Sequence, residues 1–111
     1  MARFVKGDVV IVPFPFSDLS QSKRRPALVI ANLRGDDLIL CQITSQNHTD
    51  FYAVAINNND FETGILSKPS NIRTNRIFTA DQSIILSIAG HLKSIKTNEV
   101  IAKVIEILNT P

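Results

Sequence analysis

The chain has 111 residues, of which 44% are hydrophobic and 20% charged, with a formal net charge of +2 and a pI of about 8.9. This composition predicts a single folded domain over 1–111 with a modest core, and it excludes an intrinsically disordered chain. The weak positive charge is compatible with a polyanionic partner but does not identify one.

The cysteine content and the hydropathy pattern indicate the cellular compartment of the protein and the kinds of site it can hold. The single cysteine, Cys41, cannot form an intrachain disulfide, which fits a reducing cytoplasm, and its apolar neighbours predict a buried structural thiol. No Cys/His cluster has metal-ligand spacing, so we expect no metal and no cofactor. We expect no signal peptide, because 1–10 has no apolar core ahead of Gly7-Asp8, and no membrane span, because the apolar runs are short.

The N-terminal part predicts a strand followed by a long loop. Consecutive β-branched residues stopped by Pro13 predict a first strand over 8–14. Prolines, serines and charges dominate 13–26, which is therefore predicted as a loop. A loop longer than roughly 12 residues in a compact domain is more often functional than idle.

A hairpin follows. Strands are expected over 27–31 and 37–44, joined by a tight turn in which Gly35 supplies a positive φ. With Arg34-Gly35 as the central turn residues, Arg25 lies opposite Thr44, and opposed residues share a face with Cβ atoms roughly 4.5–5.5 Å apart. A three-residue loop would shift this register by one and still leave the two ends as neighbours.

The second half predicts more short strands and then a helix. Thr97 is expected to cap a helix that begins at Asn98, with Glu99 in its first turn. Strands are expected over 51–57, 64–67, 71–79 and within 84–92, the last with Gly90 as a bend. Apolar residues follow at helical spacing, namely Val100, Ile101, Val104, Ile105 and Leu108. The predicted fold is mainly β (α+β), a small, partly closed β-barrel with a C-terminal helix against it.

The open end of the hairpin combines cations with hydroxyl groups. Arg24, Arg25, Thr44 and Ser45 meet there, and a guanidinium beside hydroxyls is well suited to bind a phosphate. In RNA, the 2′-hydroxyl next to each phosphate is a built-in nucleophile that a protein must align while it stabilises the added negative charge. Arg25 is a poor base at its usual pKa, so we expect it to stabilise charge. The same residues also occur as purely structural features of unrelated barrels.

The order of these segments resembles a known family. Gly7-Asp8-Val9-Val10, Arg25-Pro26-Ala27-Leu28-Val29-Ile30 and Gln42-Ile43-Thr44-Ser45-Gln46, followed by Ser70–Asp81 and Ile85–Leu92, are similar to the MazF/PemK (Kid-like) toxins of bacterial toxin–antitoxin systems. The resemblance implies an SH3-like barrel with a C-terminal helix that works as a homodimer. It also implies metal-independent cleavage of single-stranded RNA, often mRNA, to a 2′,3′-cyclic phosphate. A cognate antitoxin, whose flexible tail occupies the RNA groove, is the implied partner.

The resemblance also assigns site residues. The family's arginine before proline falls on Arg25 and its strand-end threonine on Thr44, which we predict to be catalytic. Well-known members carry a Gly-rich stretch with a Glu where this chain reads FPFSDLS, so Ser17 and Asp18 are the candidates to replace that acidic contact. The predicted RNA-binding residues are Ser17, Asp18, Lys23, Arg24, Ser45, Gln46 and Arg76.

Several other residues have a structural and a functional interpretation. Arg76 is either part of a basic rim along RNA or a solvated cation, whereas Arg73 is interpreted as an exposed cation on a half-buried strand. A loop histidine such as His48 could act as a base but is more often merely exposed. Asp8 is expected to accept a hydrogen bond at a strand start, and His91 to have no catalytic role.

Two alternative functions use the same fold without cleavage. One is a gyrase poison of the CcdB type, and the other is a binding module that holds RNA but does not cut it. The presence of both Arg25 and Thr44 favours the nuclease, because a gyrase poison would concentrate its function on the C-terminal helix.

Overall fold

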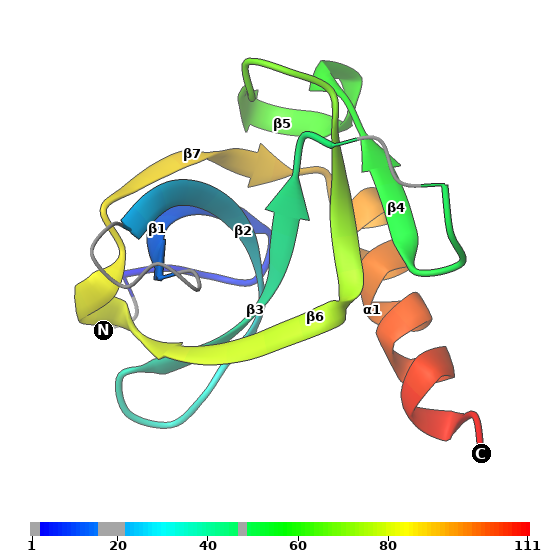
Figure 1. Ribbon diagram of the computed structural model, residues 1–111. Coiled ribbons are helices and arrows are strands. Elements are labelled where there is room, and N and C mark those ends of the chain that lie inside the picture. The colour runs from blue at the N-terminus through cyan, green and yellow to red at the C-terminus, as the bar shows by residue number, and fades with distance from the viewer. Residues whose placement is uncertain (1–2, 16–21, 47–48) are drawn as a thin grey trace.

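The computed structural model describes residues 3–15, 22–46 and 49–111, which form a curled antiparallel sheet with one α-helix beside it (Figure 1). The sheet has seven strands in the order β4-β6-β3-β2-β1-β7-β5. This architecture confirms the prediction of a mainly β barrel-like fold with a C-terminal helix. The elements are β1 (Asp8–Pro15), β2 (Ser22–Asn32), β3 (Asp37–Thr44), β4 (Ala53–Ile56), η1 (Asn58–Asp60), β5 (Phe61–Gly64), β6 (Ser70–Asp81), η2 (Gln82–Ile84), β7 (Ser87–Leu92) and α1 (Ser94–Asn109).

The central strands are buried on both faces. Leu28 on β2 and Cys41 on β3 belong to one apolar cluster, which also includes Val100 of α1. The next residues along the same strands, Val29 and Leu40, belong to a second cluster on the opposite face. Burial of each such side chain contributes about 1.5–3 kcal/mol, so these runs of apolar residues determine which strands lie at the centre of the sheet.

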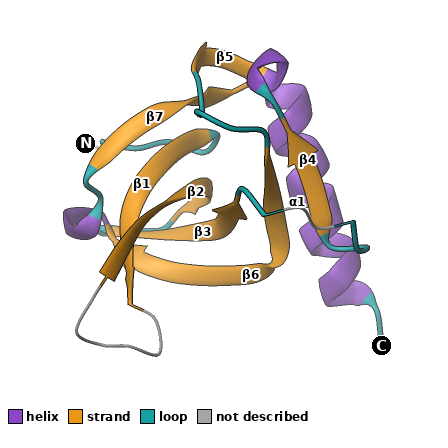
Figure 2. Cartoon of the chain, turned by 45° about the horizontal axis from the view of Figure 1, so that its top comes forward, coloured by secondary structure: helices purple, strands orange, loops and turns teal. Residues whose placement is uncertain are grey.

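The helix begins earlier than the sequence predicts. It starts at Ser94 rather than Asn98, and Lys93 occupies the N-cap position without a side-chain hydrogen bond. Thr97 is therefore not the cap but a buried residue of the first turns, and its N–H donates to the carbonyl of Lys93 at 3.1 Å. The helix runs alongside β4 and β6 in both views (Figures 1 and 2). The predicted apolar stripe is buried at Val104, whereas Leu108 near the helix end is exposed.

Both described ends of the predicted long loop over 13–26 are strand. β1 extends to Pro15 and β2 begins at Ser22, and Arg25 pairs with Val12 across this hairpin. Charged residues are tolerated there because the ends of both strands run out of the core into solvent. The described parts of this segment, 13–15 and 22–26, thus continue two core strands, and 16–21 lie outside the described residues.

Other strand boundaries also shift. The strand predicted over 64–67 lies instead at Phe61–Gly64, because Phe61 is buried opposite Leu92 of β7. The strand predicted over 51–57 is confined to β4, that over 71–79 extends to Ser70–Asp81, and that within 84–92 is Ser87–Leu92 after a short 3-10 turn. The existence of these elements is confirmed, and their limits are set by tertiary pairing.

The β2–β3 hairpin agrees with its predicted register near the middle of the strands. Ala27 pairs with Gln42 and Val29 with Leu40, and Gly35 in the turn has a φ of +86°. A one-residue shift separates Val29 from the pairs nearer the turn. Ala27 and Gln42 form the last pair of this ladder towards the open end. The predicted pair of Arg25 and Thr44 therefore lies beyond the ladder between β2 and β3.

β6 bends sharply and so reaches two partners. Ile72 pairs with Ile43 of β3, but Ile77 pairs with Cys41, so residues 73–76 have no partner on β3. The first part of β6 also pairs with β4, and Figure 1 shows the strand changing direction between the two parts. The bend brings the β4 side of the sheet next to the open end of the hairpin. No helix in the described part of the chain is long and apolar enough to cross a membrane.

Candidate nucleic-acid interface

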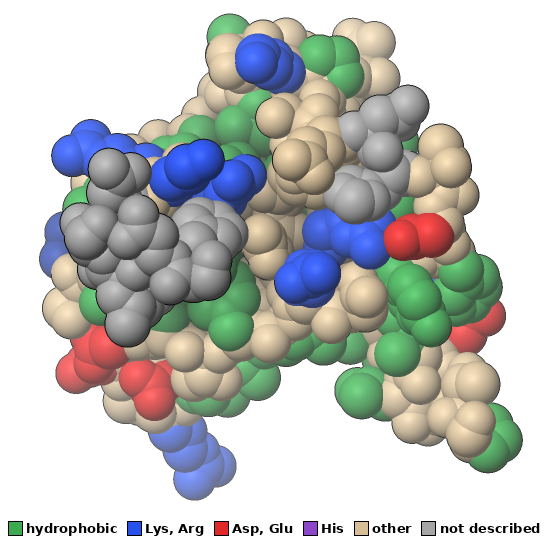
Figure 3. All heavy atoms as spheres, in the orientation of Figure 1, with side chains coloured by type: hydrophobic (Ala, Val, Ile, Leu, Met, Phe, Trp, Pro, Cys, Tyr) green, Lys and Arg blue, Asp and Glu red, His purple; other side chains and the backbone are tan. Residues whose placement is uncertain are grey.

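A basic pocket lies at the open end of the β2–β3 hairpin. It has a volume of about 280 Å³ and is lined by three cations, Arg24, Arg25 and Lys68. Three serines also line it, Ser45, Ser67 and Ser70, together with Ile11, Pro26, Ile43 and Leu66. Among the described residues, no Asp or Glu lines this pocket. Figure 3 shows several Lys and Arg side chains on one face of the molecule, separated by uncharged surface.

The two strands beneath the pocket hold Arg25 in place. Its backbone pairs with Val12, and the following Pro26 pairs with Ile11, so Arg25 belongs to the continuous ladder between β1 and β2. Arg25 is half-buried, while Arg24 is exposed. On the opposite side, Ser70 Oγ donates to the carbonyl of Lys68 at 2.9 Å and fixes the turn before β6. The cations therefore converge from two separate parts of the sheet on one concave surface, an arrangement suited to bind a phosphate.

Thr44 lies beside this pocket and is not among the residues that line it. Its side chain is buried, and Oγ1 accepts a hydrogen bond from the N–H of Gln46 at 3.2 Å. This bond closes a tight turn over 44–46 and leaves Ser45 exposed at the pocket. Of these two neighbouring hydroxyl residues, Ser45 lines the pocket, and Thr44 shapes the backbone turn that presents it.

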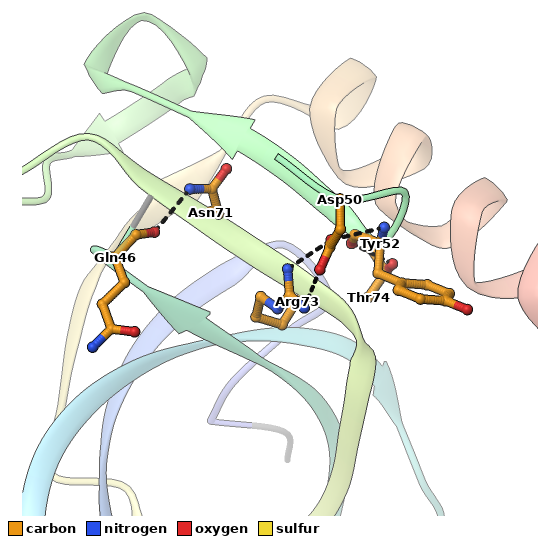
Figure 4. Close-up of polar contacts among 6 residues, drawn as sticks. All are labelled: Gln46, Asp50, Tyr52, Asn71, Arg73 and Thr74. Carbon is orange, nitrogen blue, oxygen red and sulfur yellow. Dashed lines mark hydrogen bonds and ion pairs between the residues drawn. The ribbon is translucent and has the colours of Figure 1, made fainter. Parts of the chain in front are cut away.

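Three residues of β6 hold the segment that follows Thr44 (Figure 4). Asn71 Nδ2 donates to the carbonyl of Gln46 at 3.1 Å. Arg73 donates to both carboxylate oxygens of Asp50, at 2.9 and 2.8 Å. A third contact joins Thr74 to Tyr52, whose carbonyl accepts from the threonine hydroxyl at 2.6 Å and from its N–H at 3.1 Å. Gln46, Asp50 and Tyr52, which lie between β3 and β4, are thereby tied to β6.

Arg73 corrects the prediction of an exposed cation. Only 6% of the residue is exposed, and its guanidinium forms a bidentate ion pair with Asp50. The hydrogen bonds to Asp50 raise the pKa of Arg73 above its ordinary value, against the opposing effect of burial. Strand alternation does not reveal this pair, because Asp50 lies in another segment of the chain and cannot be identified from residue spacing.

Asp8 and His91 form a separate, structural contact. Asp8 accepts from the N–H of Val5 at 2.9 Å, which agrees with its predicted role at a strand start, and its other oxygen lies 2.8 Å from His91 Nδ1. Gly7, with a φ of +102°, packs so closely on the imidazole that a Cβ atom there would lie 2.8 Å from His91 Cε1. Neither Asp8 nor His91 lines the basic pocket.

The thiol of Cys41 is unsuited to nucleophilic chemistry. It is fully buried, and burial raises its pKa to about 12. This confirms the prediction of a structural thiol. In the described ranges there is no group of three or more His, Cys, Asp or Glu side chains placed to share a metal ion.

Comparison with known proteins establishes the family. A model of the PemK-like, MazF-like toxins of type II toxin–antitoxin systems matches residues 5–108. The chain belongs to this toxin family. A comparison with curated protein sequences finds no match.

Solved structures share the fold of this PemK/MazF-family toxin at low sequence identity. A MazE–MazF crystal structure (Form-III) from Deinococcus radiodurans has a TM-score of 0.78 and 18% identity over 99% of this chain and 100% of that one. An endoribonuclease in complex with its cognate antitoxin, from a mycobacterial species, has a TM-score of 0.77 and 15% identity over 97% of each chain. Mycobacterium tuberculosis toxin MazF-mt6 has a TM-score of 0.73 and 13% identity over 94% and 98%.

The structure of the toxin gathers only part of the predicted RNA-binding set. Arg24 and Ser45 line the basic pocket with Arg25. Lys23 and Gln46 are exposed near it, and Arg76 is exposed on the bend of β6, but these three do not line it. Ser17, Asp18 and His48 fall outside the described residues.

Sequence reasoning missed one side of the pocket. Lys68, Ser67 and Ser70 come from the connection between β5 and β6 and its junction with β6. The sequence contains Lys68-Pro69, a cation before a proline like Arg25-Pro26, between the strands predicted over 64–67 and 71–79. Nothing local indicates that the two cation–proline steps face one pocket, because the sheet order that brings them together is a long-range property.

Proposed function

We propose that this toxin is a ribosome-independent endoribonuclease that cuts single-stranded RNA in the basic pocket. The observation that carries the proposal is the convergence of Arg24, Arg25 and Lys68 with serine hydroxyls on one concave surface, without an acidic residue in its described lining. Such a surface favours a phosphodiester over a neutral or cationic ligand. Family membership makes RNA the expected polyanion.

The proposed reaction uses the 2′-hydroxyl of the RNA itself. Its oxygen attacks the adjacent phosphorus as the hydroxyl proton is lost, the bond to the 5′-oxygen breaks, and that oxygen gains a proton. The products are a 2′,3′-cyclic phosphate and a 5′-hydroxyl end. Arg25 stabilises the negative charge that builds on the phosphoryl oxygens, and a preorganised donor of this kind is worth roughly 10²–10³ in rate.

The neighbouring residues have distinct proposed roles. Ser45 donates a hydrogen bond to the scissile phosphate, and Thr44 holds Ser45 in position through its bond to the N–H of Gln46. Arg24 and Lys68 attract the flanking backbone. These roles modify the sequence prediction that Thr44 itself fixes the phosphate, since its side chain is buried in the turn.

The proposed partners follow from the family and from the charge of the pocket. We infer that a cognate antitoxin with an acidic, flexible tail covers the basic pocket and blocks RNA. Two of the compared structures are toxin–antitoxin complexes, which supports this kind of partner. We further infer a homodimer that acts in the cytoplasm without a metal ion.

The test is cleavage of a long defined RNA by purified protein. Arg25→Ala should lower the rate at least 100-fold, whereas Arg34→Ala, in the exposed turn at the opposite end of the hairpin, should leave it within twofold. Both variants should keep the wild-type circular dichroism spectrum, and a chelator should not slow the wild type. Undiminished cleavage by Arg25→Ala would reject the site. RNA binding by the wild type without cleavage would support the binding-module alternative.

A further inference from the structure

We propose that a second pocket beside the basic pocket binds one nucleobase next to the cleaved phosphate, and that Asn57 and Asn71 select that base. This inference rests on the proposed ribonuclease function. It assigns sequence preference to the β4–β6 side of the site rather than to the segment between β1 and β2.

The two pockets share a wall. The second pocket has a volume of about 370 Å³, near the lower end of the range of roughly 300–1,000 Å³ for small-ligand sites. Ser45 and Ser70 line both pockets, so a group bound in one lies next to a group bound in the other. The remaining lining residues of the second pocket are Ala55, Ile56, Asn57, Pro69 and Asn71.

The character of the second pocket differs from that of the first. Its described lining contains no charged side chain, whereas the basic pocket contains three cations. Ala55 and Pro69 offer apolar surface for the flat face of a base, and the two asparagine amides offer hydrogen bonds for its polar edge. A charged pocket beside a neutral one matches a nucleotide, in which a phosphate alternates with a base.

The hydrogen bonds that the two amides already form fix which end of each is left for a ligand. Asn57 Oδ1 accepts from the N–H of Asn59 at 2.8 Å, so its NH₂ group is the end available as a donor. Asn71 Nδ2 donates to Gln46 at 3.1 Å, and its oxygen points away from that contact as an acceptor (Figure 4). One donor and one acceptor match the Watson–Crick edge of a base, on which an acceptor lies beside a donor. The position of the donor relative to the acceptor differs between adenine or cytosine and guanine or uracil, so two fixed amides can discriminate between these pairs.

The strands hold these groups in position before any ligand binds. Ala55 pairs with Asn71, and Ile56 pairs with Ser70, across β4 and β6. Asn57 is also fixed through its N–H, which donates to Asp60 at 2.9 Å. A preorganised site loses little conformational entropy on binding, so it can discriminate between bases that differ by one donor or acceptor.

The experiment maps the RNA ends produced by the wild type and two variants on a long RNA of balanced composition. Asn57→Asp keeps the oxygen that accepts from Asn59 and replaces the donor by a second acceptor. Ala55→Phe fills the pocket from an exposed position on β4. Ala102→Phe, at an exposed position on α1, is the matched control.

We expect the wild type to prefer one base over the others at one position flanking the cut. Asn57→Asp should reduce that preference roughly tenfold, because it replaces the free donor of the pocket by a second acceptor. Ala55→Phe should abolish the preference at this position and raise KM, and Ala102→Phe should change neither. A wild-type map that both variants preserve would overturn the base pocket and leave the proposed ribonuclease intact. A wild type that cuts no RNA would instead reject the proposed function.

Discussion

The ion pair between Arg73 and Asp50 gives a quantitative prediction for stability. We consider Asp50→Ala, which leaves the guanidinium without its bidentate partner. The side chain of Arg73 is only 8% exposed, whereas that of Asp50 is 46% exposed, and their closest atoms are 2.8 Å apart. The same substitution also removes the 3.1 Å bond from the N–H of Tyr52 to Asp50 Oδ1.

The expected loss lies between two limits. Removal of one partner of a fully buried pair costs about 3–5 kcal/mol, and an exposed pair contributes about 0–1 kcal/mol. Because one partner is buried and the other half-exposed, we expect Asp50→Ala to lower the free energy of unfolding by about 2 kcal/mol. For a chain of this length that corresponds to a fall in Tm of ~8 °C. Asp50→Asn keeps the shape and one acceptor, so it should lose about half as much.

Urea unfolding at matched protein concentrations measures this loss, with an unchanged m-value as the sign that only stability has changed. Glu106→Gln is the control, since the Lys103–Glu106 pair has a 3.5 Å separation on the exposed face of α1 and should contribute less than about 0.5 kcal/mol. A cycle with Arg73→Met should show coupling, because the double variant no longer has a buried cation without a partner. Equal, small losses for Asp50→Ala and Glu106→Gln would show that the Arg73–Asp50 pair contributes no more than an exposed ion pair.

Two further predictions concern the core. A Cβ atom at Gly90 would lie 2.5 Å from the Thr63 carbonyl oxygen, so Gly90→Ala should cost about 1–3 kcal/mol in urea unfolding. Gly35→Ala, at a positive φ but in open space, should cost only about 1 kcal/mol, and a reversed order would contradict the packing described here. The pKa of Cys41 rises from 9.0 to about 12 in the folded state, so the unfolded state loses its thiol proton first and stability should fall between these pH values. The fall with pH should be steeper in the wild type than in Cys41→Ala by up to about 1.4 kcal/mol per pH unit; equal slopes in the two proteins would argue against burial of the thiol as the cause.

Features determined by neighbouring residues were predictable from the sequence. The β-branched run of β1, the turn at Gly35 and the middle of the β2–β3 register follow from residue preferences and hairpin geometry. These were enough to place Arg25 at the open end of a hairpin. The family resemblance rests on the same segments, and it was confirmed over most of the chain.

Features determined by distant contacts were not predictable. The early start of α1 and the strand character of Lys23–Pro26 depend on pairing with other segments, which outweighs local composition. Two sides of the candidate site depend on the bend of β6, since it brings Lys68 towards Arg25 and Arg73 towards Asp50. A cation next to a proline carries no information on which distant cation it will face.

The most direct test of the proposed chemistry is a single 2′-deoxy substitution in an RNA that the toxin cuts. The site of cleavage is first mapped on the unmodified RNA, and the nucleotide on the 5′ side of the cut is then replaced by its 2′-deoxy form. We expect a 2′,3′-cyclic phosphate end on the unmodified RNA, and no cut at that site in the modified RNA although it still binds. Cleavage of both RNAs at the same rate would contradict this expectation, because the nucleophile would then not be the 2′-hydroxyl beside the phosphate held by Arg25.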